Sequence, residues 1–182
     1  MQPRPSKLIA LAVLSPLVLT ACYEVTFPVR ESFVVDIPEF DVEELSESPD
    51  GWAFEEASPV HDTEKLMAQL PDGAQKYADL RLIDVMITSP EAGNLGEWLT
   101  DISLYVSTDD VLSPDDDLIV ELPELPPEQV QFLVPFPEGT TLQRFVEAGT
   151  LAVITTGTLV ALPGERVAIT IDVNAEGIVD PI

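Results

Sequence analysis

The feature that most constrains the fold of this chain is a period-two alternation of apolar residues, which recurs along most of its length. The clearest run lies at residues 166–173, where Val167, Ile169, Ile171 and Val173 occupy every second position. Because successive side chains of a strand point to opposite faces, such a run predicts a strand buried on one side. Similar runs occur at residues 25–37, 81–88, 101–107, 118–122, 129–136, 150–156 and 158–162. The run at 25–37 predicts either one strand or two strands joined by a tight turn.

These runs predict seven or eight short strands separated by turns rich in proline, glycine and aspartate. Long helices, which parallel strands need as crossover connections, are absent from the pattern. We therefore expect an all-β, mostly antiparallel β-sandwich. Two of the strands, 150–156 and 158–162, are expected to form a hairpin about Gly157.

One or two short helices are expected to accompany the strands. Residues 62–70 have Asp62 or Thr63 as a cap. Residues 140–148 begin with a capping-box pattern, Thr140-x-x-Gln143, and are followed by Gly149, which suits the residue after a helix. Residues 38–61 lack a clean period and contain a strong turn signal, so they are expected to form an acidic loop.

The alternation also predicts which side chains form the core. We expect eight buried positions in particular: Ile83, Ile102, Leu104, Phe132, Val153, Val167, Ile169 and Ile171. In the run at 81–88, Ile83 is placed on the same face as Val85 and Ile87. In the run at 118–122, Leu118 is placed on the same face as Val120.

The first 21 residues have a different character. Residues 1–7 include Arg4 and Lys7 and no acid, and residues 8–19 are apolar except for Ser15 and Pro16. A basic segment, an apolar segment and a small-residue cleavage site are the marks of a secretory signal. The apolar segment is shorter than the roughly 20 residues that a membrane-spanning helix needs. Residues 8–20 are therefore expected to form a helix that packs loosely or not at all on the rest.

Residues 19–22, Leu-Thr-Ala-Cys, resemble the lipobox of bacterial lipoproteins, and Cys22 is the only cysteine of the chain. The resemblance covers residues 1–22. It implies that the Cys22 sulfur carries a diacylglycerol, that residues 1–21 are removed, and that the new amino group is acylated. Several acyl chains together make a stable membrane anchor. In lipoproteins of enteric bacteria, an aspartate after the cysteine retains the protein in the inner membrane. This chain has Tyr23 there, so the resemblance implies the outer membrane of a Gram-negative bacterium.

Residues 22–182 are expected to form a single acidic domain, similar to uncharacterised sandwich-type lipoproteins of Gram-negative bacteria. All 33 acidic residues follow Cys22, together with six of the eight basic ones, so this part carries a formal charge of −27. Such a charge argues against binding nucleic acid and against lying flat on an anionic membrane. It also resembles the composition of proteins from salt-adapted organisms.

The residues that common catalytic sites require are missing. His61 is the only histidine, no nucleophile motif surrounds it, and the resemblance assigns the only thiol to a lipid. One histidine cannot make a zinc site. Paired carboxylates could serve a hydrolase, but pairs arise by chance in a chain this acidic. We therefore expect a protein that is not an enzyme.

Acidic residues cluster at Asp36–Glu56 and at Asp109–Glu128, and the second of these clusters suggests a cation site. Calcium takes six to eight oxygen ligands, which loops rich in aspartate can supply. The candidates are Asp109, Asp110, Asp115, Asp116 and Asp117, although the spacing does not match an EF-hand loop. The expected function is a lipid-anchored envelope protein with a structural or binding role. The alternative is a calcium-dependent recognition module for carbohydrate or another envelope protein.

Overall fold

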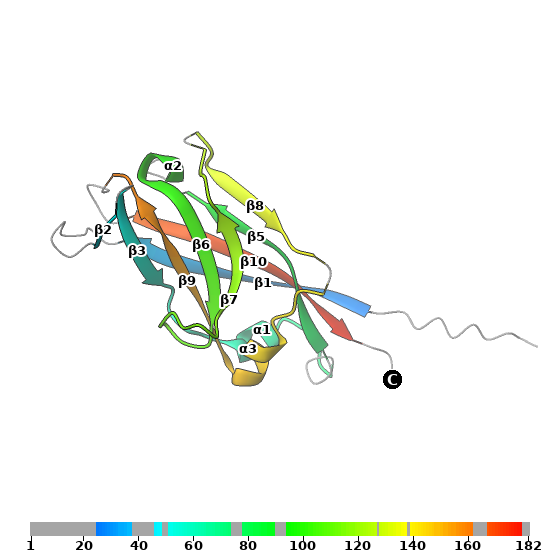
Figure 1. Ribbon diagram of the computed structural model, residues 1–182. Coiled ribbons are helices and arrows are strands. Elements are labelled where there is room, and N and C mark those ends of the chain that lie inside the picture. The colour runs from blue at the N-terminus through cyan, green and yellow to red at the C-terminus, as the bar shows by residue number, and fades with distance from the viewer. Residues whose placement is uncertain are drawn as a thin grey trace, which may run out of the picture.

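The computed structural model describes residues 25–37, 46–48, 51–73, 78–89, 94–126, 128–137, 139–161 and 167–179. Within these residues the chain forms ten strands and three short helices (Figure 1). In chain order they are β1 (Val25–Ile37), β2 (Ser46–Ser48), β3 (Gly51–Ala57), β4 (His61–Asp62), α1 (Thr63–Met67), β5 (Ala78–Thr88), α2 (Leu95–Trp98), β6 (Leu99–Ser107), β7 (Asp117–Leu122), β8 (Gln131–Pro135), α3 (Gln143–Ala148), β9 (Thr150–Leu159) and β10 (Val167–Val179).

The strands form two antiparallel sheets. One has the order β1-β10-β5-β8, and the other has the order β2-β3-β9-β6-β7, with β4 pairing with β9. The first strand pairs with the last, and the pairing then proceeds inward along the chain: β1 with β10, β3 with β9, β5 with β8, and β6 with β7. A long antiparallel hairpin wrapped in this way into two sheets is a jelly roll. The predicted all-β sandwich is confirmed.

The core lies between the two sheets and combines side chains from both. Phe33 and Ile171 come from one sheet, whereas Leu104 and Val153 come from the other, and all four are fully or almost fully buried. Of the eight positions predicted to be buried, six are: Ile102, Leu104, Phe132, Val153, Ile169 and Ile171. The Val167 side chain lies outside the described residues.

Ile83 was predicted to be buried, and this prediction is wrong: its side chain is 38% exposed. Opposite β5, Asn174 pairs with Asp84 but Ala175 pairs with Leu82, so Ile83 is an extra residue in its strand. Such a β-bulge reverses the phase of the alternation. The apolar residues on both sides of the bulge thereby face the core, and Ile83 faces outward.

A second bulge changes the phase of β7. Leu104 pairs with Val120 and Tyr105 pairs with Leu118, which leaves Ile119 as the extra residue. Leu118, predicted to share the buried face with Val120, is 48% exposed for this reason.

Gly157 does not form the predicted hairpin turn, because β9 runs through it without interruption. Glycine is needed at this position because a side chain would collide with its neighbours. A Cβ at this position would lie 2.5 Å from the carbonyl oxygen of Asp101 and 2.7 Å from Cε1 of Phe54. The glycine thus leaves room for the Phe54 ring and for the neighbouring strand.

The prediction of an acidic loop at 38–61 is wrong for two segments, whereas residues 38–45 and 49–50 lie outside the described residues. Residues 46–48 and 51–57 are the paired strands β2 and β3, and β3 continues the sheet beside β9. Phe54 is buried, whereas its neighbour Glu55 is exposed. The burial of Phe54 in the core favours a strand here, even though the segment is rich in acidic residues.

The two predicted helices are present as α1 and α3, which lie together at one end of the sandwich (Figure 1). Asp62 caps α1 as predicted. The capping box of α3 is wrong, because the Gln143 N–H donates to Oγ1 of Thr141 rather than of Thr140. Gly149 ends α3 in the left-handed conformation, with φ 83°, as predicted. The short helix α2 was not predicted.

Candidate functional site

The predicted lipidation site, Cys22, and the predicted helix at residues 8–20 lie outside the described residues. Strand β1 begins at Val25, three positions after Cys22. Among the helices that the structure describes, none is both long enough and apolar enough to cross a membrane.

The predicted calcium ligands Asp109 and Asp116 lie in the connection between β6 and β7, where they cap local turns. Oδ1 of Asp109 accepts a hydrogen bond from the Val111 N–H at 3.0 Å. Oδ2 of Asp116 accepts one from the Ser113 N–H at 2.6 Å. Carboxylates of this kind commonly satisfy backbone donors in turns.

Arg144 of α3 contacts the same connection. Its Nη2 donates to the carbonyl oxygen of Asp115 at 2.6 Å, and its Nε lies 3.1 Å from Oδ2 of Asp117. A cation is thus already present beside two of the predicted ligands.

Asp110, the fifth predicted ligand, lines a separate cavity of about 510 Å³ with Asp36, Glu55 and Glu56. Across the described ranges, no three His, Cys, Asp or Glu side chains are placed to hold a metal ion. The structure therefore does not bring the five predicted acids together as a metal shell. Calcium-dependent recognition gains no support from this geometry.

The acids of that cavity affect one another. Burial raises the pKa of the Glu56 carboxyl above its ordinary value of 4.5, and the negative charges of Asp36 and Glu55 raise it further. Both effects disfavour the charged form of Glu56.

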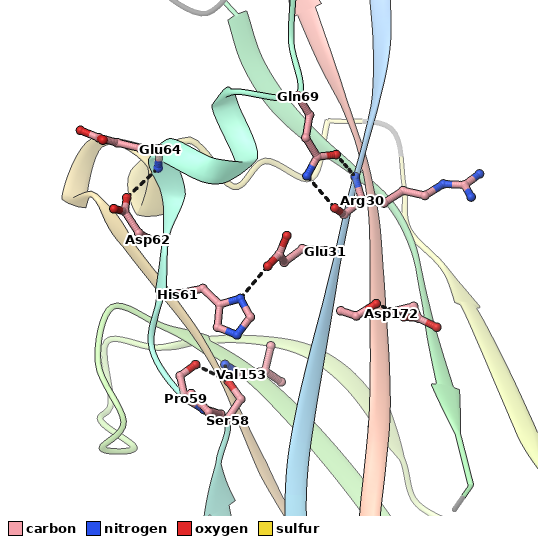
Figure 2. A network of polar contacts seen from close by, with 11 residues as sticks. Arg30, Glu31, Ser58, Pro59, His61, Asp62, Glu64, Gln69, Val153 and Asp172 are labelled. Atoms are coloured by element: carbon pink, nitrogen blue, oxygen red, sulfur yellow. Dashed lines mark hydrogen bonds and ion pairs between the residues drawn. The ribbon is translucent and has the colours of Figure 1, made fainter.

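A polar contact inside the sandwich was not predicted. Glu31 occupies an inward-facing place on β1, between Val29 and Phe33. Its Oε1 lies 2.6 Å from Nδ1 of His61, and both side chains are about three-quarters buried (Figure 2). The His61 ring also packs on the ring of Phe33, with the centroids 4.5 Å apart. This contact joins β1 to β4.

Ser58 lies near this pair, so the region holds a serine, a histidine and a glutamate (Figure 2). The Ser58 hydroxyl is buried, donates to the Pro59 carbonyl at 3.1 Å and accepts from the Val153 N–H at 3.0 Å. Because its hydrogen goes to a backbone oxygen, Ser58 is not arranged as a nucleophile activated by His61.

Gln69 fixes the neighbouring residue of β1. Its side-chain amide accepts from the Arg30 N–H at 3.0 Å and donates to the Arg30 carbonyl at 2.7 Å (Figure 2). Strand β1 is at the edge of its sheet, and Pro28 interrupts the donors of this edge. The Arg30 and Glu31 side chains project to opposite sides of β1 (Figure 2).

On the outer side, Arg30 borders a groove of about 700 Å³ that crosses β1, β10 and β5. Polar side chains on its floor form hydrogen bonds between strands. Nδ2 of Asn174 donates to Oδ1 of Asp84 at 2.6 Å. The second pair is Ser32 with Asp172, through the serine hydroxyl. The third joins Glu176 to Arg81, which lies beside the groove and not in its lining, at 2.8 Å from Nε and also through Nη2.

Neither the groove nor the Glu31–His61 pair was found from the sequence. One signal was available for the pair: Glu31 interrupts an apolar alternation at the position where the next apolar residue is due. A carboxylate that faces the core needs a hydrogen-bond or ion-pair partner, and His61 is the only histidine in the chain that could be this partner.

No family model and no curated protein matches the chain. Two solved structures that resemble it are capsid proteins of BFDV. The decameric form has a TM-score of 0.42 and 12% sequence identity, over 86% of this chain and 99% of that one. The 60-mer form has a TM-score of 0.39 and 10% identity, over 87% of this chain and 94% of that one. The strand order of this chain, and not these two similarities, shows that it is a jelly roll. None of the comparisons shows a family for the chain.

Proposed function

We propose that this chain is a non-enzymatic, lipid-anchored protein of the cell envelope with a structural or binding role, held at the outer membrane of a Gram-negative bacterium. One observation supports the proposal most: the only cysteine stands at the end of a lipobox-like segment, three positions before the first strand. A lipid on Cys22 would hold the sandwich close to the membrane, with Tyr23 and Glu24 as the only connection.

The charge of the chain is consistent with attachment through lipid rather than through surface electrostatics. Residues 22–182 carry a formal charge of −27, so anionic head groups repel the domain. Acyl chains contribute about 0.8 kcal/mol for each buried methylene, and two or three chains are enough for stable attachment. The domain would then stand at the surface with its faces open to partners.

The test is metabolic labelling of the full chain with an alkyne-tagged fatty acid, followed by phase separation in detergent. The unaltered chain is expected to take up the label and enter the detergent phase. Cys22→Ala removes the thiol and should yield an uncleaved or unlabelled product. Tyr23→Phe, which changes the neighbouring residue and keeps the thiol, is the matched control. Normal labelling of Cys22→Ala would refute the proposed anchor.

A further inference from the structure

We propose that the groove on the outer face of β1, β10 and β5 binds a neutral, hydroxyl-rich oligosaccharide without calcium. Its volume of about 700 Å³ lies within the usual range for ligand sites, roughly 300–1,000 Å³. The inference rests on the binding role in the proposed function and gives that role a ligand class. It does not depend on an anchor at Cys22.

The hydrogen-bonding groups of the groove are held in place before any ligand arrives. Each of the three cross-strand pairs joins residues that lie directly opposite in the sheet register. An ionised carboxylate has about four acceptor positions, so Asp84, Asp172 and Glu176 retain acceptor capacity after these pairs form.

Arg30 supplies the complementary donors. Of the arginines in the ranges that the structure describes, Arg81 and Arg144 pair with carboxylates, whereas the Arg30 guanidinium makes no hydrogen bond or ion pair. Its backbone is fixed by Gln69, and its side chain projects to the groove side of β1 (Figure 2). A guanidinium has five N–H donors, so it can bond two neighbouring hydroxyls at once.

The balance of charge decides which polar ligand fits. Four acidic residues line the groove, but the Glu31 carboxylate faces inward to His61, which leaves those of Asp84, Asp172 and Glu176. With Arg30 in the lining and Arg81 paired to Glu176 beside it, these groups have a net charge of −1. An anionic ligand would meet the three carboxylates, and a cationic one would meet Arg30. Hydroxyl groups both donate and accept, so a neutral saccharide can use the carboxylates and Arg30 together.

The bulge in β5 adds an apolar wall to this polar floor. It turns Ile83 outward, where its side chain lines the groove with Met86 and Pro28. Sugar rings have an apolar C–H side as well as hydroxyl edges, and this wall can cover that side. Bulges are frequent next to functional sites because they redirect side chains in this way.

The experiment is calorimetric titration of the full chain in detergent, with a chelator present. The probes are four neutral hexasaccharides, built from glucose in α- and β-linkage, mannose and N-acetylglucosamine, together with hexagalacturonate and hexaglucosamine as acidic and basic probes. At least one neutral probe is expected to bind. Arg30→Ala and Asp84→Asn should each weaken that binding by roughly tenfold or more. Arg144→Ala removes an arginine outside the groove and should leave the affinity unchanged.

Binding of a neutral probe that both groove variants weaken and Arg144→Ala does not would support the inference. It would be overturned if no neutral probe binds, if only the acidic or basic probe binds, or if neutral binding survives both groove variants. Thermal melts of the variants show that a loss of binding is not a loss of folding. Cys22→Ala should bind as the unaltered chain does, so failure of the anchor and failure of the groove are measured separately.

Discussion

Replacement of Gly157 by alanine tests the packing between β3, β6 and β9. The added Cβ would lie 2.5 Å from the backbone oxygen of Asp101 and 2.7 Å from the Phe54 ring. Backbone cannot move aside as a side-chain end can, so the sheet itself must shift. Overpacking of a core costs about 1–3 kcal/mol, and the removal of a strand glycine returns about 0.5–1 kcal/mol. We expect a net loss of roughly 1–2 kcal/mol.

The matched control is Gly177→Ala, another glycine within a strand. There the added Cβ would meet the methyl groups of Leu70, the flexible end of a side chain. We expect a smaller loss than at Gly157. Chemical denaturation and thermal melting measure both variants, and a net loss of this size should lower Tm by about 2–8 °C at Gly157. If Gly157→Ala melts at or above the unaltered chain, or no lower than Gly177→Ala, the reasoning is refuted.

Two further predictions concern charged groups. Glu56→Gln should be more stable than the unaltered chain at neutral pH. Asp36, Glu55 and burial raise the folded-state pKa of Glu56, so its contribution to stability falls as pH rises from about 4.5 through that raised pKa. Urea melts across this window should show the advantage of the variant growing with pH, and a constant difference would contradict the prediction. His61→Ala should cost about 1–2 kcal/mol, because it leaves the carboxylate of Glu31 without its partner. A double-mutant cycle with Glu31→Gln measures the coupling, and additive losses would show that the pair does not contribute.

The sequence predicted the fold class because most strands keep a strict alternation. Ile169 and Ile171 lie in an uninterrupted register and were placed correctly. Ile83 and Leu118 were misplaced because each lies at a bulge, and a bulge is set by how two strands pair rather than by either strand alone. Gly157 was misplaced for a similar reason, since the ring that requires a glycine there comes from β3, about a hundred positions earlier.

The sites were harder to predict than the fold. Glu31 and His61 are 30 positions apart, and they meet only in the folded chain, where β4 pairs with β9 and the His61 ring packs on Phe33 of β1. The acids at 109–117 were predicted as ligands because they lie close together in the sequence. The sequence does not show where their side chains point, and Asp109 and Asp116 accept hydrogen bonds from backbone N–H groups of the same connection. The groove combines residues from three strands that are distant in the chain, each unremarkable in its local sequence.

The pairing of β1 with β10 has a consequence for how the protein forms. The paired residues are between 130 and 154 positions apart, and they run the full 13-residue length of both strands. Contacts between distant residues require closure of a long loop, and chains dominated by them fold slowly. During synthesis, β1 emerges first among the described strands, and its neighbour β10 emerges last among them. Its apolar face therefore stays exposed until β10 has been synthesised, and exposed apolar strands of this kind are prone to aggregate.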